Sequence, residues 1–176
     1  MICYVCIITK TSPIGILQDK SFQYQECITI NSTTMSTINP YLNFNGTTEE
    51  AFLFYKEALG GEILTIQRFK DTPEAGSLTP ELGEKLMHIS LKIGDTVLMG
   101  TDALESQGFK IKEGNNFHLS LNAKSEVEAE TFFSNLSKGG KVTQPLAKQF
   151  WGAYFGMLTD KFGTNWMVSY DTVNPN

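Results

Sequence analysis

The sequence predicts an α+β fold of two βαβββ modules, whose strands form a curved mixed sheet around a cup. Two observations carry this prediction. The halves 40–100 and 117–170 share one order of elements, and each half has a single amphipathic helix followed by a glycine pair. A chain of 176 residues, 41% hydrophobic and 19% charged, is long enough for one ordinary core. We therefore expect one domain over 35–171 and a short tail at 172–176.

The first helix is predicted to begin at a capping box, Thr47-x-x-Glu50, in which a hydroxyl and a carboxylate bind free backbone N–H groups. Gly60-Gly61 ends it, because glycine readily adopts the left-handed conformation of a helix C-terminus. The apolar stripe between them, at helical spacing, is Ala51, Phe54, Tyr55 and Ala58.

The second helix repeats the pattern. Ser125-x-x-Glu128 is the second capping box, and Gly139-Gly140 ends the helix. The corresponding stripe is Ala129, Phe132, Phe133 and Leu136.

Strands are predicted before and after each helix from period-2 alternation. Those of the first half are 41–45, 62–69, 86–93 and 96–99, and those of the second are 117–122, 141–150, 153–159 and 165–170. Proline and glycine predict a long loop at 71–85, and 101–116 is predicted to link the halves.

Alternation also divides each strand into two faces. We expect the apolar face to contact the helices; its members are Leu42, Phe44, Met87, Ile89, Leu91, Ile93, Phe117, Leu119 and Leu121. The mixed face is expected to line the cup; its members are Tyr41, Asn43, His88, Ser90, His118 and Ser120.

Residues 1–34 lack sustained periodicity and precede a second methionine, Met35. We interpret them as a leader outside the fold, either a mis-assigned translation start or a loosely attached extension. All three cysteines lie there, so no disulfide framework is implied and a reducing cytoplasm is the simplest location. Cys3-x-x-Cys6 has redox or zinc spacing, but no second ligand pair follows it, and we interpret it as coincidence.

The charge balance excludes several classes of partner. Fourteen Lys and Arg against 19 Asp and Glu give a net charge of -5, which offers no broad basic face to nucleic acid or an anionic membrane. No apolar stretch approaches the roughly 20 residues of a membrane span. A small molecule is the expected partner.

Three motifs resemble those of a known family. They are Pro40-Tyr41-Leu42-x-Phe44-x-Gly46; Phe54-Tyr55-x-x-x-Leu59-Gly60-Gly61; and Phe150-Trp151 followed by Phe155-Gly156-x-x-Thr159-Asp160-Lys161-Phe162-Gly163-x-x-Trp166-Met167. Residues 36–171 resemble the vicinal oxygen chelate superfamily of glyoxalase I, extradiol dioxygenases and bleomycin-resistance proteins, and more closely its PhnB-like branch. Some members of that branch are labelled 3-demethylubiquinone-9 3-methyltransferase, but this sequence has no G-x-G loop after a strand for a methyl donor.

The resemblance implies a divalent metal held by His or Glu from the first and last strands of each module. Only His118 matches a ligand position, and Met167 occupies the glutamate position. The other two positions offer Tyr41 or Asn43, and Leu98 or Met99. A metal needs three or more N, O or S donors, so we expect no high-affinity metal site, and the cofactor is unknown.

Aromatic residues of the segment 150–155 are expected over the cavity mouth, where they could stack on a planar ligand. The candidate ligand-binding residues are Tyr41, Asn43, His88, His118, Ser120, Trp151, Tyr154 and Met167. Structural alternatives are a half-buried His118 hydrogen-bonded to Tyr41 or Ser120, and a structural or rim role for His88.

Three functions are compatible with these residues. The first is a cytoplasmic, homodimeric protein that binds or sequesters a small molecule without a metal. The second is a metal-dependent lyase, isomerase or dioxygenase that uses His118. The third is a regulatory or interaction domain with a vestigial cup. No nucleophilic triad can be assembled, which disfavours a hydrolase.

Overall fold

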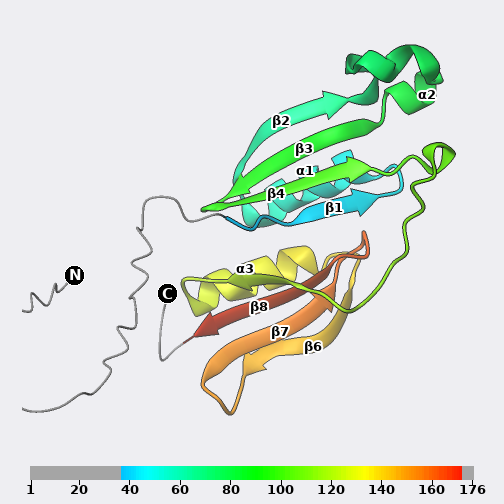
Figure 1. The fold of residues 1–176 in the computed structure, drawn as a ribbon. Coiled ribbons are helices and arrows are strands. Elements are labelled where there is room, and N and C mark those ends of the chain that lie inside the picture. The colour runs from blue at the N-terminus through cyan, green and yellow to red at the C-terminus, as the bar shows by residue number, and fades with distance from the viewer. Residues whose placement is uncertain (1–36, 172–176) are drawn as a thin grey trace, which may run out of the picture. The chain divides into compact units, whose positions relative to one another are not determined.

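Each half of the chain folds as one βαβββ module, which confirms the predicted α+β class (Figure 1). The computed structural model describes residues 37–171, so the predictions for the leader, its cysteines and the tail concern residues outside this range. The first module contains β1 (Tyr41–Phe44), α1 (Thr48–Leu59), β2 (Glu62–Arg68), η1 (Phe69–Asp71), η2 (Pro73–Ser77), α2 (Pro80–Gly83), β3 (Leu86–Ile93) and β4 (Thr96–Asp102). The linker holds η3 (Glu105–Gln107), and the second module contains β5 (Leu119–Asn122), α3 (Glu126–Leu136), β6 (Lys141–Lys148), β7 (Ala153–Thr159) and β8 (Asn165–Asp171).

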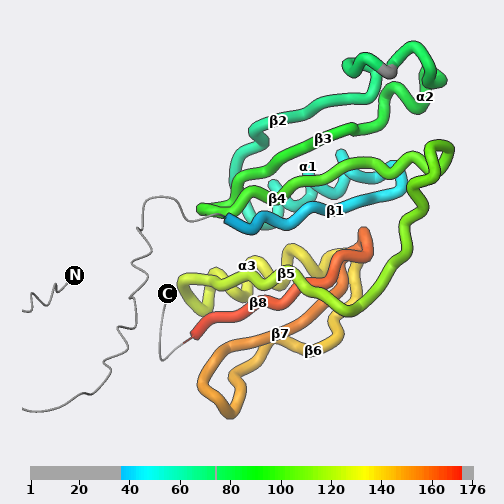
Figure 2. The backbone as a smooth tube through the Cα atoms, viewed as in Figure 1, coloured from blue at the N-terminus to red at the C-terminus, as the bar shows by residue number. Residues whose placement is uncertain are grey.

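The strands form two four-stranded mixed sheets with the same order, β1-β4-β3-β2 and β5-β8-β7-β6. The first strand of each module pairs in parallel with the last, and the other pairs are antiparallel. Figure 2 shows the linker that runs from the end of β4 to β5. Within residues 37–171, none of the helices has both the length and the apolar character that a membrane span requires.

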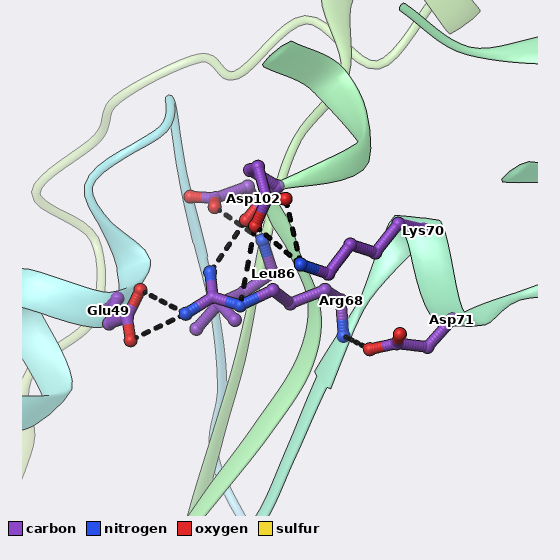
Figure 3. A network of polar contacts seen from close by, with 7 residues as sticks. Glu49, Arg68, Lys70, Asp71, Leu86 and Asp102 are labelled. Carbon is purple, nitrogen blue, oxygen red and sulfur yellow. Dashed lines mark hydrogen bonds and ion pairs between the residues drawn. The ribbon is translucent and has the colours of Figure 1, made fainter. Parts of the chain in front are cut away.

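The N-terminus of α1 is capped by a carboxylate from a distant strand, so the capping box predicted at Thr47 and Glu50 is wrong. The Thr47 side chain makes no capping hydrogen bond. Instead, one oxygen of Asp102 accepts from the backbone N–H and the hydroxyl of Thr48. The other oxygen accepts from the Leu86 N–H at 2.8 Å (Figure 3). A buried anion at this end also suits the positive pole of the helix dipole.

The N-terminus of α3 is capped locally, as predicted. The Ser125 hydroxyl accepts from the Glu128 N–H at 3.1 Å. The Glu128 carboxylate accepts from the Lys124 N–H at 2.6 Å, one residue earlier than in a capping box. The two helices therefore have the same place in their modules, but different groups cap their N-termini.

A phenylalanine of α1 and a phenylalanine of α3 each pack against a glycine in the sheet of the same module. A Cβ atom on Gly100 of β4 would lie 2.5 Å from the Phe52 ring, and one on Gly156 of β7 would lie 2.7 Å from the Phe133 ring. Real Cβ atoms do not approach other atoms so closely. Because Gly100 and Gly156 have no side chain, α1 and α3 can approach their sheets this closely.

Tyr55 joins the two modules. It is fully buried in α1, and its hydroxyl lies 3.0 Å from the Thr164 hydroxyl in the β7–β8 turn. Its ring contacts Trp166 of β8 edge to face, at 5.4 Å between centroids. Nearby, the Asn135 side-chain amide of α3 donates to the Ala58 carbonyl of α1 at 3.3 Å. The buried core is consequently continuous across both modules.

The environment of Tyr55 predicts a loss of stability in alkali. Burial raises the pKa of this phenol well above its usual range, and the nearby Asp160 carboxylate raises it further. In the unfolded chain it ionises near pH ~10. Above that pH the unfolded state binds fewer protons than the folded state, so stability falls as pH rises.

We expect Tyr55 to contribute a slope of up to about 1.4 kcal/mol per pH unit above pH ~10. Urea denaturation on both sides of that pH measures the slope, and Tyr55→Phe should remove this part of it. The same variant should also lose about 1 kcal/mol at neutral pH with the Thr164 hydrogen bond. An unchanged alkaline slope in Tyr55→Phe would contradict the prediction.

The connection between β2 and β3, predicted as a loop at 71–85, contains short helical turns and is tied to α1 by Arg68 (Figure 3). The guanidinium contacts both carboxylate oxygens of Glu49 at 2.9 Å and donates to the Glu84 carbonyl at 2.7 Å. Lys70 pairs with the Glu84 carboxylate at 2.8 Å. These charged groups pair with one another and hold the connection in place, so we do not interpret them as a separate site.

Candidate functional site

The structure brings the side chains of two predicted site residues, Tyr41 and His88, into contact. The Tyr41 hydroxyl lies 3.3 Å from His88 Nδ1, and their ring centroids are 5.8 Å apart. Tyr41 is 45% exposed, whereas its neighbour Leu42 is buried in the core. The pair therefore lies on the sheet face opposite the core, as alternation predicts. Burial raises the pKa of the Tyr41 phenol, and a hydrogen bond with the Thr101 hydroxyl opposes part of that rise.

A cavity of about 860 Å³ lies beside β1. Of the predicted site residues, Tyr41 and Asn43 line it. The remaining walls come from the rest of β1 and the loop after it, from the linker and from the β7–β8 turn: Leu42, Phe44, Asn45, Thr47, Glu105, Ile111, Lys112, Glu113, Gly114, Phe117, Phe162, Gly163 and Thr164. The cavity thus draws side chains from both modules and combines aromatic surface with polar groups.

Three predicted residues of the second module, Ser120, Met167 and His118, lie on β5, on β8 and just before β5, and they do not line this cavity. Ser120 and Met167 are direct neighbours across the parallel β5–β8 pair. His118 is half-buried and immediately precedes β5, which begins two residues later than predicted. Within residues 37–171, no hydrogen bond connects His118 to Tyr41 or Ser120.

Tyr154 lies on the helix side of its sheet, so its predicted place in the cup is wrong. Its hydroxyl donates to the Glu130 carboxylate of α3 at 3.1 Å, and its ring packs against the core. Trp151 lies in the β6–β7 connection and is half exposed, between the rings of Phe150 and Phe155. Strand alternation explains the error, because Tyr154 and Phe155 point to opposite faces of β7.

The metal-ligand positions implied by the family resemblance do not form a donor set. Opposite Ser120, β8 presents the thioether of Met167, and Leu98 of β4 is buried in the core. Met99 pairs with Tyr41 across β4 and β1. Across residues 37–171, no three His, Cys, Asp or Glu side chains lie together in a way that could hold a metal ion. One imidazole with a thioether does not satisfy Zn, Mn or Fe.

Sequence reasoning missed the linker's part in the cavity. Phe117 was expected to face a helix, but it is 54% exposed and lines the cavity wall. Glu105, Lys112 and Glu113 add two negative charges and one positive charge, and none of them forms an ion pair with another described residue. The only local signal was the aromatic Phe117 beside His118. The folding back of the linker onto β1 has no sequence signature.

The buried carboxylates near the cavity are engaged by the fold. Asp160, 4% exposed, accepts from the N–H groups of Phe162 and Thr164 at 2.8 and 3.0 Å and from Trp166 Nε1 at 2.8 Å. Asp102 is bound in a similar way at the start of α1. Each of the two carboxylates therefore accepts three hydrogen bonds from groups of the fold.

The chain is similar to several known proteins. The family model described as Glyoxalase/Bleomycin resistance protein/Dioxygenase superfamily matches residues 37–168. Protein YjdN of Escherichia coli (strain K12) is 30% identical over 140 residues, which are 75% of this chain and 93% of that protein.

Two solved structures share the fold over most of their length. Protein PA1353 from Pseudomonas aeruginosa is 38% identical, with a TM-score of 0.70 over 78% of this chain and 98% of that chain. A putative 3-demethylubiquinone-9 3-methyltransferase, PhnB protein, from Bacillus cereus is 24% identical, with a TM-score of 0.62 over 77% of this chain and 99% of that chain. The second likeness concerns the fold alone.

Proposed function

Because this chain belongs to the glyoxalase/bleomycin resistance protein/dioxygenase superfamily, we propose that it binds a small, partly aromatic molecule beside β1 without a metal. The observation that carries the proposal is the cavity of about 860 Å³, which lies within the range of ligand pockets. Tyr41 and Phe117 supply exposed ring surface, and Asn43 supplies an amide that could fix the orientation of the ligand. The outlying candidates His118, Ser120, Trp151 and Met167 are proposed to contact larger ligands only.

A fragment screen by ligand-observed NMR tests this proposal. We expect flat aromatic fragments to bind, and Phe117→Ala to weaken the best of them at least about tenfold, a loss of about 1.4 kcal/mol. Phe150→Ala is the matched control, since this ring is 97% exposed and does not line the cavity. If both variants bind the fragments as the wild type does, the cavity is not the ligand site. If no fragment binds, the result favours the alternative of a regulatory or interaction domain with a vestigial cup.

The metal-dependent alternative rests on His118 alone. Elemental analysis of protein purified without an affinity tag or chelator, beside His118→Ala, separates the two functions. We expect no stoichiometric Zn, Ni, Mn or Fe in either protein, including after each ion has been added back, because the donor set is incomplete. A near-stoichiometric metal that is lost in His118→Ala would favour a lyase, isomerase or dioxygenase instead.

We further propose that the protein is a cytoplasmic homodimer and that its functional chain begins at Met35. These proposals rest on the family membership and on the composition of residues 1–34. Light scattering coupled to size-exclusion chromatography measures the first. The intact mass of the native protein tests the start at Met35. A mass that corresponds to a chain beginning at Met1 would refute that start.

A further inference from the structure

Two walls of the cavity beside β1 are held firmly by the fold. All four residues of β1 are paired with β4. The β7–β8 turn is closed by the Asp160 N–H, which donates to the Thr164 carbonyl at 2.9 Å, and by the hydrogen bonds of the Asp160 carboxylate. The Phe162 ring of this turn also packs edge to face on Phe44 of β1, at 6.4 Å between centroids. Neither wall can move without breaking several of these contacts.

The third wall, residues 105–117 of the linker, has far fewer attachments (Figure 2). Its first turn, η3, follows the buried Leu104, whose carbonyl accepts two backbone N–H groups. Beyond this turn, one hydrogen bond joins the segment to the rest of residues 37–171: the Gly114 carbonyl accepts from Asn165 Nδ2 at 3.4 Å. Nearly all residues of the segment are exposed. A segment with so few buried and hydrogen-bonded groups opens at a low cost in free energy.

The side chain that holds this wall is itself fixed. Asn165 is 9% exposed and directly follows the cavity residue Thr164. Its amide oxygen accepts from the Thr159 hydroxyl at 2.8 Å, which leaves the amide nitrogen to face Gly114. A carbonyl only accepts, so the nitrogen is the end of the amide that can bind it. At 3.4 Å this hydrogen bond is longer than the usual ~2.9–3.0 Å, and it therefore holds the segment loosely.

We propose that residues 105–117 form a strap, which is released from Asn165 and closes again over a bound ligand as the movable wall of the cavity. Asn165 is then a positioning residue, because it acts on the ligand only through Gly114 and the strap. The ligand part of this inference rests on the proposed function. It is supported by the apolar side chains that the strap contributes to the cavity, Ile111 and Phe117, because a ligand packed against them would withdraw their surface from water.

Limited trypsin digestion of the full chain measures the release of the strap without any ligand. Lys110 and Lys112 lie in the strap, and cleavage after them requires its backbone to leave the wall and enter the protease. Lys92 lies in β3, which is paired on both sides, so cleavage after Lys92 reports unfolding of the module. The mass of each fragment identifies the site. The quantity to compare is the rate of strap cleavage in excess of the rate at Lys92.

Asn165→Asp should raise this excess rate about fivefold. The variant keeps an oxygen for the Thr159 hydroxyl but places a second acceptor against the Gly114 carbonyl, so the hydrogen bond that holds the strap is lost. Fivefold is the change in open population that corresponds to one ordinary hydrogen bond.

Thr159→Val is the matched control. It removes the same hydrogen bond on the other side of the Asn165 amide and leaves Nδ2 facing Gly114, so the excess rate should stay within about twofold of the wild type. An unchanged rate in Asn165→Asp would overturn the inference. An equal rise in both variants would also overturn it, because it would show a general loosening of the β7–β8 turn.

The ligand part is tested with the flat aromatic fragment that binds best in the screen described above. At a concentration ten times its Kd, this fragment should slow the excess strap cleavage of the wild type about tenfold. If the fragment binds and loses affinity in Phe117→Ala but leaves strap cleavage unchanged, closure over the ligand is refuted and the proposed cavity stands. If no fragment binds, the proposed function fails, while digestion without a ligand still decides whether Asn165 holds the strap.

Discussion

Replacing Gly156 with alanine should destabilise the protein by about 3 kcal/mol or more. The new Cβ would lie 2.7 Å from the Phe133 ring, and 2.8 and 2.9 Å from the backbone Cα and N atoms of Leu146 on the neighbouring strand β6. A ring could turn away more easily than the backbone of β6, which is paired with β7 on either side of Leu146. Overpacking a well-packed interior costs typically about 1–3 kcal/mol, and contact with backbone places this site at the upper end.

Gly100 and Gly76 provide graded controls for this experiment. Gly100→Ala would press on the Phe52 ring at 2.5 Å, mainly a side-chain clash, so we expect a smaller loss than at Gly156. A Cβ on Gly76 meets nothing within 4 Å, and Gly76→Ala should stay within about 0.5 kcal/mol of the wild type. Urea denaturation measures all three. Equal stability of the Gly156 and Gly76 variants would refute the idea that glycine sets the helix–sheet spacing.

Removal of the Asp160 carboxylate should destabilise the protein about as much as Gly156→Ala. Its two oxygens accept three hydrogen bonds, from the backbone N–H groups of Phe162 and Thr164 and from Trp166 Nε1. A buried donor left without a partner costs about 1–3 kcal/mol. We expect Asp160→Ala to cost about 3 kcal/mol or more in urea denaturation. It should also weaken the joint between the modules, since Thr164 is the partner of Tyr55.

A double-mutant cycle isolates the contact with the indole. Asp160→Asn retains one oxygen for the two backbone N–H groups but places an amide N–H against Trp166 Nε1, so two donors face each other. Trp166→Phe removes the indole donor. Asp160→Asn should therefore cost less in the Trp166→Phe background than in the wild type, by about 1 kcal/mol or more. Strictly additive losses would show that the indole hydrogen bond does not contribute to stability.

Much of the candidate site on the first sheet could be read from alternation alone. Tyr41, Asn43 and His88 were assigned to the face opposite the helix, and the structure places Tyr41 and Asn43 on the cavity and Tyr41 against His88. The aromatic residues of 150–155 together suggest the cavity mouth for Tyr154, but its position in the β7 alternation places it on the helix side, against Glu130 of α3. The linker residues of the cavity, Phe117 among them, were missed because an irregular segment carries no periodicity that would say where it folds back.

The sequence by itself determined the two modules, their helices and the faces of their strands, because each of these depends on neighbours within about four residues. Only the tertiary structure decided that Asp102 caps α1, that Tyr55 joins the modules and that the Tyr41 hydroxyl lies beside the His88 ring. Those contacts join residues far apart in the chain. Sheet order and register bring them together, and short-range patterns contain neither.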